Sequence, residues 1–260
     1  MTEQDYWARK RVLITAGAAG IGLSMAKAFL DKGALVWVCD VADDKLAEAA
    51  TVLPGLGTMH CDVSDPAQVD AFVAAAVADM GGLDFVINNA GIAGPAAPVE
   101  DISTEDWVRT HAINVNGQFF VARATVPHLK RNGWGVMICM ASVAGKFAFP
   151  LRSPYASSKA AVISFARGLS VELGPHKIRV NAITPGVVNG ERIRRVFTDR
   201  AATKGITYEE MEQIALRAVS LKTAVEPEEI AEMALYLCSP AARAVTGQVM
   251  SICGGLEYTE

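Results

Sequence analysis

The sequence predicts an α/β protein in which helices cover both faces of one parallel sheet of about seven strands, in a single domain over residues 1–260. Short apolar runs alternate with helix-like segments along nearly the whole chain, and such alternation is typical of strands joined by crossover helices. The runs are almost continuously apolar, as strands buried on both faces require. A chain of 260 residues, 51% of them hydrophobic, suits one large domain or at most two.

The order of the elements follows from the apolar runs and the residues that interrupt them. The predicted strands cover residues 11–15, 34–39, 58–61, 83–87, 136–140, 178–183 and 249–252. The predicted helices cover residues 20–30, 43–51, 66–79, 104–130, 155–173 and 227–238. Ser64 or Asp65 is expected to cap the helix that begins at Pro66, because proline suits a first turn. Residues 187–224 are charged and too long for a plain connection, so they form either an ordinary helical insertion or a lid over an active site.

Composition and charge favour a small-molecule partner over nucleic acid or a membrane. The net charge is −4 and no long basic run is present, which argues against nucleic acid. No apolar stretch has the length of a membrane span, and residues 1–11 lack the apolar segment of a signal peptide. Five scattered cysteines without a C-x-x-C motif are expected to be buried, reduced thiols of a cytoplasmic protein. The four histidines lack metal-ligand spacing, so no metal site is predicted.

Tyr155 and Lys159 are four residues apart, in a segment whose alanines and apolar residues predict a helix. That spacing places the phenol and the ammonium side by side on one helix face. A phenol ordinarily loses its proton at about pH 10, and a neighbouring ammonium lowers that pKa by stabilising the phenolate. A tyrosine tuned in this way can exchange a proton with an alcohol or a carbonyl. An exposed Tyr–Lys pair on an ordinary helix has the same spacing, so the pair needs support from the rest of the chain.

Residues 15–22, Thr-Ala-Gly-Ala-Ala-Gly-Ile-Gly, lie between the first strand and the first helix. Small residues there let the backbone approach a pyrophosphate, which the N–H groups of a helix N-terminus can bind, although a tight turn is the simpler interpretation. Asp40 ends the second strand about twenty residues further on, where an acid can accept hydrogen bonds from a ribose diol. A carboxylate there repels a 2′-phosphate, and Ala18, Ala19 and Val41 offer no compensating charge. The sequence therefore predicts NAD rather than NADP, while a capping or turn role would also account for Asp40.

These features belong to a longer series of motifs that runs through the chain in order. The series comprises the turn at residues 15–22, Asp62-Val63, Asn88-Asn89-Ala90-Gly91, Asn114, Ser142, Tyr155-x-x-x-Lys159, Pro185-Gly186, Thr246-Gly247-Gln248 and Gly254-Gly255. From about Arg11 to Gly255 the sequence resembles the short-chain dehydrogenase/reductase family. The resemblance implies a Rossmann-like, doubly wound fold and direct hydride exchange between a nicotinamide cofactor and a substrate carbon. It also implies that the helices containing residues 104–130 and 155–173 form subunit interfaces, in a homotetramer or a homodimer.

The resemblance assigns catalytic roles to four matching residues. Tyr155 is expected to be the general acid/base, and Ser142 to orient the reacting oxygen. Lys159 is expected to lower the phenol pKa and to hold the nicotinamide ribose. Asn114 is expected to support a water chain that links Lys159 to solvent.

The resemblance also implies a set of cofactor contacts, with two departures from the family pattern. The predicted cofactor-binding residues are Gly17, Gly20, Ile21, Gly22, Asp40, Asp62, Val63, Asn89, Ala90, Gly91, Tyr155, Lys159, Pro185, Gly186 and Val188. Within this set Asp62 and Val63 would contact the adenine, and Val188 would face the nicotinamide carboxamide. The first glycine of the family's turn is Ala16 here, and alanine is strained if that position needs a positive φ. No threonine follows the Pro-Gly pair, so backbone groups or Asn189 must help to hold the nicotinamide.

Basic residues near the predicted site bear on the substrate. Lys146 and Arg152 lie in the loop after the fifth strand, and residues 187–224 contain several arginines. A basic cluster over the reacting carbon suits a carboxylate, sulfonate or phosphate, whereas a solvated face paired with Glu191 and Asp199 is the plainer alternative. The candidate substrate residues are Ser142, Lys146, Arg152, Tyr155, Arg192 and Arg195.

The predicted activity is NAD-dependent interconversion of a secondary alcohol and a ketone on a small polar substrate such as a sugar, polyol or hydroxy acid. Such an enzyme is an alcohol dehydrogenase or ketone reductase, and NAD favours the oxidative direction. A 3-oxoacyl-thioester reductase is the alternative that a preference for NADP would favour. The fold also hosts dinucleotide-binding proteins without catalytic activity, but an enzyme is favoured because Asn114, Ser142, Tyr155 and Lys159 are all present.

Overall fold

Seven parallel strands form one sheet in the order β3-β2-β1-β4-β5-β6-β7 in the computed structural model, which describes residues 3–256. The strands are β1 (Arg11–Thr15), β2 (Leu35–Asp40), β3 (Gly57–His60), β4 (Phe85–Asn88), β5 (Gly135–Met140), β6 (Ile178–Pro185) and β7 (Val249–Ile252). The predicted parallel sheet is therefore confirmed, with strand ends within two residues of their expected positions. The strand order reverses at β1, whose neighbours are β2 and β4. Sheets of this kind bind ligands beyond the carboxyl ends of their strands at such a point.

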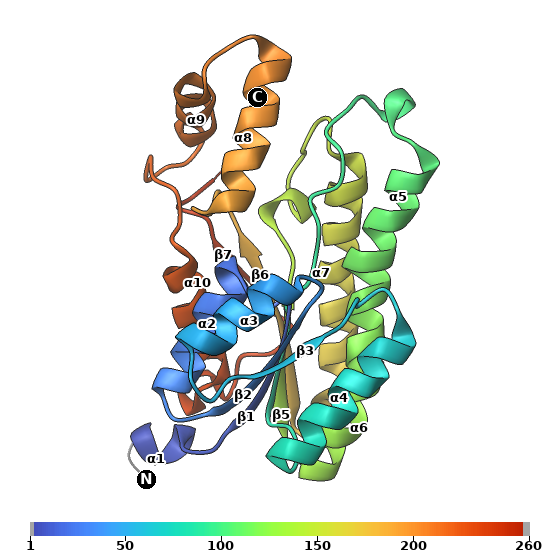
Figure 1. Cartoon of the computed structure of the whole chain (residues 1–260), viewed down its shortest axis with the longest axis vertical. Helices are drawn as coiled ribbons and strands as arrows, with labels where there is room; N and C mark the ends of the chain where they lie inside the picture. The colour runs from blue at the N-terminus through green and yellow to red at the C-terminus, as the bar shows by residue number, and fades with distance from the viewer. Residues whose placement is uncertain (1–2, 257–260) are drawn as a thin grey trace.

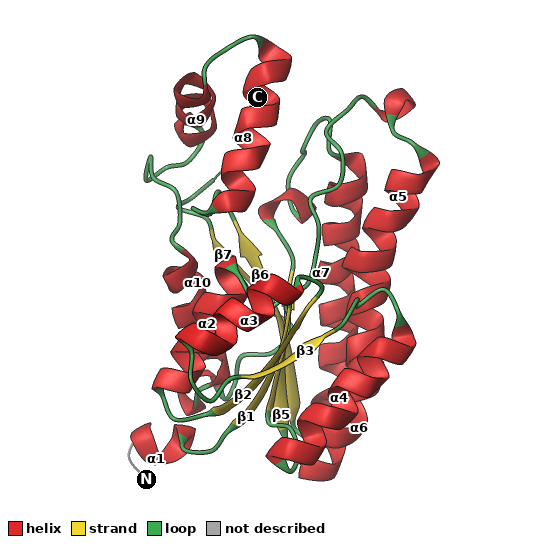
Figure 2. Ribbon diagram, in the orientation of Figure 1, coloured by secondary structure: helices red, strands yellow, loops and turns green. Residues whose placement is uncertain are grey.

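Helices cover both faces of the sheet, as Figures 1 and 2 show. One face carries α2 (Gly20–Asp31), α3 (Asp43–Val52) and α10 (Pro227–Cys238), and the other carries α4 (Pro66–Met80), α6 (Gly117–Asn132) and α7 (Ser153–Leu173). The sequence does not predict the short helix α1 (Glu3–Trp7), because most of its residues are polar. This helix is anchored by Trp7, which is buried against Phe29 and Phe85.

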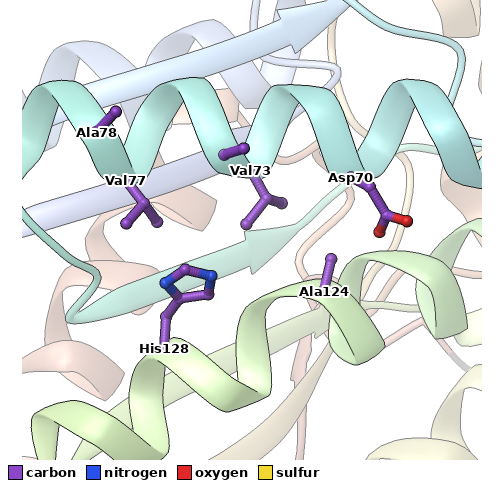
Figure 3. Close-up of a pocket in the computed structure, with 7 residues that line it drawn as sticks. Asp70, Val73, Val77, Ala78, Ala124 and His128 are labelled. Carbon is purple, nitrogen blue, oxygen red and sulfur yellow. The ribbon is translucent and has the colours of Figure 1, made fainter.

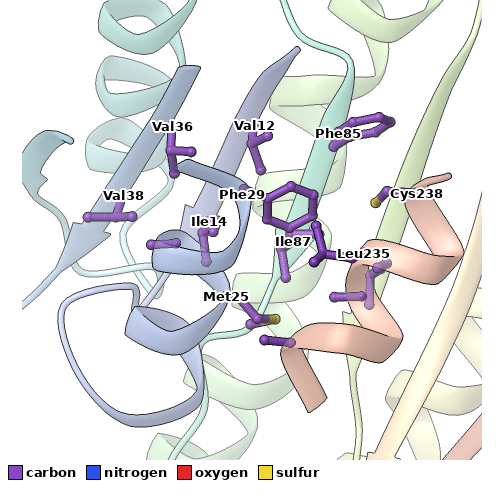
Figure 4. Packing of buried hydrophobic residues seen from close by; sticks show 14 of the residues in the cluster. Val12, Ile14, Met25, Phe29, Val36, Val38, Phe85, Ile87, Leu235 and Cys238 are labelled. Atoms are coloured by element: carbon purple, nitrogen blue, oxygen red, sulfur yellow. The ribbon is translucent and has the colours of Figure 1, made fainter. Parts of the chain in front are cut away.

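Two apolar layers hold the helices to the sheet. Successive side chains of a strand point to opposite faces, so Val12 and Ile14 belong to the layer under α2 and α10, whereas Leu13 belongs to the layer under α4 and α6. Figure 4 shows the first layer, in which Phe29 and Leu235 pack over the strands. Every residue of β4 and β5 is buried, which explains why these strands are apolar except for Asn88 at the end of β4.

Helix ends follow the capping residues, and one predicted helix contains an irregular turn. Asp65, rather than Ser64, caps α4 and accepts hydrogen bonds from two backbone N–H groups of the first turn. The predicted helix over residues 104–130 comprises α5 (Thr104–His111), a π-helical turn (Ala112–Asn116) and α6. Asn114 lies in the π-helical turn and is completely buried. Single π turns are frequent at functional sites.

Residues 187–224 contain a helical hairpin, α8 (Glu191–Lys204) and α9 (Tyr208–Arg217), which extends beyond the sheet in Figure 1. The hairpin has a small apolar core of its own, formed by Phe197, Ala201 and Met211. A parallel bridge between Val188 and Val225 joins the two ends of the segment. The segment is therefore an ordered helical insertion, and its role as a lid stays a prediction.

The turn between β1 and α2 is as tight as its small residues predict. A Cβ atom at Gly22 would collide with the Ala16 carbonyl oxygen, and one at Gly17 would lie 2.5 Å from the Cβ atom of Val38. Ala16 has a φ of 49°, a conformation that alanine rarely adopts. The strain expected at this position is therefore present.

An ion pair holds together the amino ends of β1 and β4, at the opposite end of the strands from the carboxyl ends. Arg11 donates through Nε and Nη2 to the two carboxylate oxygens of Asp84, each at 2.9 Å. The Asp84 side chain is only 6% exposed. Burial raises the pKa of Asp84, but the hydrogen bonds from Arg11 outweigh burial and hold that pKa below its usual value of 3.8.

We expect Asp84→Asn to lower the free energy of unfolding by about 3 kcal/mol at neutral pH, because Arg11 loses its charged partner. Since the folded-state pKa of Asp84 lies below 3.8, the wild-type protein should lose this stabilisation only as the pH falls below about 4. The control is Asp70→Asn, whose ion pair with Arg123 is exposed and should contribute less than about 0.5 kcal/mol. Urea unfolding at neutral and acidic pH measures both. Equal losses of unfolding free energy in the two variants would contradict the structural role of the Arg11–Asp84 ion pair.

We expect Ala16→Gly to raise the free energy of unfolding by about 0.5 to 1 kcal/mol, because glycine relieves the left-handed strain at a smaller cost in unfolded-state entropy. Ala47→Gly is the control, since Ala47 is exposed inside the helix α3, where glycine is less favourable than alanine. Thermal unfolding of the two variants should show opposite shifts in Tm. A destabilised Ala16→Gly protein would mean that packing of the alanine methyl group outweighs the strain.

Candidate active site

The carboxyl ends of four neighbouring strands carry most of the predicted site. Thr15 ends β1, Asn89 follows β4, Ser142 lies two residues beyond β5, and Gly186 follows β6. Because the four strands are parallel and adjacent, these positions meet at one edge of the sheet. The first half of α7 supplies the Tyr–Lys pair at the same edge, where its Lys159 contacts the last residue of β5.

Ser142, Tyr155 and Lys159 form one cluster. The Ser142 hydroxyl is close enough to the Tyr155 phenol to lower its pKa, and Lys159 Nζ lies 5.8 Å from the centre of the Tyr155 ring. Lys159 is 3% exposed and donates to the Met140 carbonyl oxygen at 2.8 Å, which fixes the ammonium at the end of β5. The Ser142 oxygen also accepts a hydrogen bond from the Ala144 N–H at 3.2 Å.

The charges around this cluster favour proton exchange at Tyr155. Burial raises the pKa of Tyr155, but nearby positive charges and the Ser142 hydroxyl outweigh burial and bring that pKa below its usual value of 10.0. The charges belong, in order of effect, to Lys159, Arg192 and Arg152. Burial also lowers the pKa of Lys159 to about 8, although the negative charge of a Tyr155 phenolate opposes this change. Both groups can therefore change protonation nearer to neutral pH than they do in water.

Asn114 connects the loop after β4 to α7. Its Oδ1 atom accepts from the Ile92 N–H at 2.7 Å, and its Nδ2 atom donates to the Ile92 carbonyl and to Ser158 Oγ, each at 3.0 Å. Gly91 borders both Asn114 and Lys159, since a Cβ atom at Gly91 would lie 3.1 Å from the Asn114 oxygen and 3.0 Å from the Lys159 nitrogen. These contacts place Asn114 beside the cluster, and its role in a water chain stays a prediction.

Thr15 and Asn89 join the two loops on either side of the switch point. The Thr15 hydroxyl accepts from the N–H groups of Asn89 at 2.9 Å and Ala90 at 3.0 Å. The Asn89 amide donates in return to the carbonyls of Thr15 at 3.1 Å and Ala16 at 3.0 Å. The loops after β1 and β4 are thereby held in a fixed relation along the predicted cofactor cleft.

The turn after β1 fits the pyrophosphate and ribose of a dinucleotide. Ala19, at the N-cap of α2, makes no side-chain capping hydrogen bond, so the N–H groups of the first turn are suited to an anion. The Asp40 carboxylate accepts from the Ala18 N–H at 3.4 Å and from the Val41 N–H at 2.8 Å. Asp40 therefore caps a local turn, and its remaining acceptor capacity suits a ribose diol.

The remaining predicted cofactor residues are held by contacts of their own. Asp62 accepts two hydrogen bonds from Ser64, and Val63 is buried. Gly186 donates to a carbonyl of β7, and Val188 pairs with the returning end of the hairpin segment. Their predicted contacts with adenine and carboxamide stay predictions.

Two of the predicted substrate residues lie close to the reacting phenol. Arg152 is 7% exposed, and its guanidinium carbon lies 5.2 Å from the centre of the Tyr155 ring. Arg192 reaches from α8 to the Gly91 carbonyl, to which its Nη2 atom donates at 3.0 Å. The structure thus brings one arginine from the start of α7 and one from the hairpin to the surroundings of Tyr155.

The other candidates for contacts with substrate or nicotinamide are placed differently. Lys146 donates to Ser251 Oγ on β7 at 2.8 Å. Arg195 is exposed and lies three residues beyond Arg192 on α8, on the same helix face. Asn189 donates to the carboxylate of the residue that precedes α10. Their predicted roles stay predictions.

Among residues 3–256, no set of His, Cys, Asp and Glu side chains is arranged to hold a metal. No helix in the described part of the chain is both long and apolar enough to cross a membrane. All five cysteines are free thiols, and four of them are buried. Figure 3 shows a separate groove between α4 and α6, lined by Asp70, Val73, Val77, Ala124 and His128 among others, and none of the lining residues belongs to the predicted site.

Sequence reasoning misses three groups that build the site. The Thr15 hydroxyl fixes the loop after β4, Ser158 bonds to Asn114, and the Met140 carbonyl holds Lys159. A hydroxyl residue at the end of an apolar strand is a signal that could have indicated Thr15. A backbone carbonyl leaves no signal in the sequence, because every residue has one.

Comparison with known proteins assigns the family. The family model described as "Enoyl-(Acyl carrier protein) reductase" matches residues 16–257. The chain is 35% identical over 248 residues to galactitol 2-dehydrogenase of Agrobacterium fabrum, a match that covers 95% of this chain and 96% of the relative.

Two solved structures share the fold over almost their whole length. A variant of actinorhodin polyketide ketoreductase with NADPH has a TM-score of 0.92 and 31% identity, covering 98% of this chain and 99% of that chain. NAD⁺-bound xylitol dehydrogenase has a TM-score of 0.91 and 28% identity, covering 96% and 99%. These matches span the strands and the strand-end residues described above, and they show that the protein belongs to the short-chain dehydrogenase/reductase family of oxidoreductases.

Proposed function

We propose that this protein is an NAD-dependent dehydrogenase that interconverts a secondary alcohol and a ketone on a small polar substrate, such as a sugar, polyol or hydroxy acid. The observation that carries the proposal is the contact of Tyr155 with Ser142 and Lys159 at the carboxyl edge of the sheet, with the pKa of Tyr155 held below its usual value. The names of the relatives support the reaction class, since they include two polyol dehydrogenases and a ketoreductase.

The proposed mechanism assigns one task to each residue of the cluster. A bound nicotinamide cofactor would supply hydride exchange with the substrate carbon. In the oxidative direction the Tyr155 phenolate takes the hydroxyl proton, while Ser142 donates a hydrogen bond that orients the substrate oxygen. Lys159 stabilises the phenolate, and Asn114 fixes the loop that borders the ammonium. In the reductive direction the neutral phenol gives its proton to the oxygen of the carbonyl group.

Asp40 supports NAD over NADP as the cofactor. Its carboxylate accepts backbone hydrogen bonds from Ala18, Val41 and Ala42, none of which adds a positive charge. A 2′-phosphate at this turn would be repelled by the carboxylate. The two solved relatives carry NADPH in one case and NAD⁺ in the other, so family membership does not decide the preference.

We also propose that the enzyme is a homotetramer or a homodimer assembled through α5, α6 and α7. Large apolar side chains exposed on these helices support the assembly, namely Trp107, Phe119 and Val171. Free, mostly buried cysteines support a reducing compartment, and we place the enzyme in the cytoplasm.

The test of the mechanism is Tyr155→Phe. We expect it to lower kcat/KM by about 10² to 10⁴-fold, because general acid/base catalysis is lost, and to change NAD affinity little. Alcohol oxidation by the wild-type enzyme should rise with pH as Tyr155 loses its proton below pH 10.0, and this rise should vanish in the variant. Ser157→Ala is the control, since Ser157 is exposed and bonds to the backbone of its own helix. Unchanged turnover in Tyr155→Phe would refute the mechanism.

The test of the cofactor assignment is Asp40→Ser. We expect the ratio of NADP to NAD affinity to rise about tenfold or more, because a negative charge near the 2′-phosphate is removed. Asp43→Asn is the control, since that exposed carboxylate pairs with His60 and should not affect the ratio. Quenching of tryptophan fluorescence measures both affinities. Equal affinity of the wild-type protein for NADP and NAD would favour a biosynthetic reductase, such as a 3-oxoacyl-thioester reductase.

A further inference from the structure

Two arginines flank the reacting phenol from different elements. Arg152 immediately precedes α7 and is buried, with its guanidinium carbon 5.2 Å from the centre of the Tyr155 ring. Arg192 is the second residue of α8, and its side chain reaches the loop after β4, where it donates to the Gly91 carbonyl at 3.0 Å. Neither residue exchanges a proton or a hydride in the mechanism proposed above, although the charges of both lower the pKa of Tyr155.

Both arginines are anchored to one short loop. The three consecutive carbonyl groups of residues 91, 92 and 93 accept side-chain hydrogen bonds at 2.8 to 3.0 Å. The donors are Arg192, Asn114 and Arg152, in that order. The two guanidinium groups therefore bond to the carbonyls that precede and follow the one bound by Asn114, in the loop that also borders Lys159.

The surroundings of Tyr155 are positively charged. The charged side chains with the largest effects on Tyr155 are Lys159, Arg192 and Arg152, all of which are cations. An oxidised nicotinamide ring adds another positive charge when it is bound. The three cations repel one another, and the repulsion is stronger where water is partly excluded. A neutral ligand leaves that repulsion in place, whereas an anionic ligand reduces it.

Arg192 can exchange its hydrogen bond to the Gly91 carbonyl for a stronger one to an anionic ligand. A hydrogen bond from a guanidinium to a neutral carbonyl is weaker than the paired, charge-assisted bonds that a carboxylate accepts from the same planar fork. Arg192 also lies in the first turn of α8, where the helix dipole disfavours a cation. Because an arginine in the first turn does not stabilise α8, its presence there indicates a role in contacts outside the helix.

We propose that Arg152 and Arg192 bind the carboxylate of the substrate, so that this enzyme acts on short-chain hydroxy acids and the corresponding keto acids. The inference rests on the proposed dehydrogenase function and narrows its substrate class. The closeness of the Arg152 guanidinium to the Tyr155 ring requires a short chain between the carboxylate and the hydroxyl-bearing carbon. The hydroxy acid loses a hydride to NAD and its hydroxyl proton to Tyr155, and the resulting keto acid keeps its carboxylate.

A binding experiment tests the inference without turnover. In the complex with NADH, the fluorescence of the reduced cofactor reports binding of propionate and of propionamide, which differ in charge but little in shape. We expect propionate to bind about tenfold or more tightly than propionamide. Equal affinity of the wild-type protein for the two compounds would overturn the proposal. Tighter binding of ethanesulfonate or ethyl phosphate than of propionate would overturn the choice of a carboxylate.

Matched variants assign the effect to the two arginines. Arg152→Gln and Arg192→Gln should each reduce the preference for propionate about tenfold. Arg194→Gln should preserve it, because the charge of Arg194 acts on Tyr208 of α9. Arg152 is buried, so Arg152→Lys serves as a second variant that keeps the charge and should retain more of the preference than glutamine. A preference that survives in both glutamine variants would refute the assignment.

Measurements of kcat/KM distinguish a failure of the carboxylate inference from a failure of the proposed dehydrogenase function. With NAD, kcat/KM is measured for lactate, 3-hydroxybutanoate and 4-hydroxypentanoate, for their amides, and for xylitol as a neutral alcohol. We expect at least one acid to exceed its amide about tenfold or more. Tyr155-dependent oxidation of amides or xylitol with no preference for acids would overturn the inference and leave the dehydrogenase function standing. Failure to bind NADH would overturn both.

Discussion

Parallel strands cannot be joined by tight turns, so each connection crosses a face of the sheet and returns to the same end. All seven strands therefore point their carboxyl ends to one edge, and the residues that follow them, such as Asn89 and Ser142, collect there. The opposite edge holds the structural ion pair of Arg11 and Asp84. The Arg11–Asp84 ion pair and the groups suited to chemistry thus lie at opposite ends of the strands.

Burial sets the electrostatics of the candidate site. An ammonium that is 3% exposed is unfavourable, and for this reason the pKa of Lys159 falls to about 8. The same exclusion of water strengthens the effect of each remaining charge on the phenol. Burial alone would raise the pKa of Tyr155, yet the neighbouring cations lower it. Burial of Lys159 is therefore unfavourable in itself, but it places the ammonium where its charge has the largest effect of any on the pKa of Tyr155.

Local patterns predict much of the fold, because apolar runs mark buried strands and a four-residue spacing marks a helix face. The strand ends and the contact between Tyr155 and Lys159 follow from such patterns. The π turn around Asn114 does not, because it depends on partners in the distant loop after β4 and in α7. Lys146 and Arg152 are neighbours in one loop, yet their side chains bond to different parts of the molecule, since irregular backbone gives no fixed direction to side chains. The partners of these side chains are determined by tertiary packing and not by the local sequence.

The two arginines near the phenol differ in how firmly they are held. Arg152 is buried at the start of α7, so its position is tied to the helix that carries Tyr155 and Lys159. Arg192 is exposed and belongs to a hairpin that packs around its own core of Phe197 and Met211. Residues on the site-facing side of such a unit can change without repacking the sheet. A fold of this kind can therefore keep one set of proton-transfer residues while the hairpin varies, which is consistent with relatives that share this architecture and differ in the compounds for which they are named.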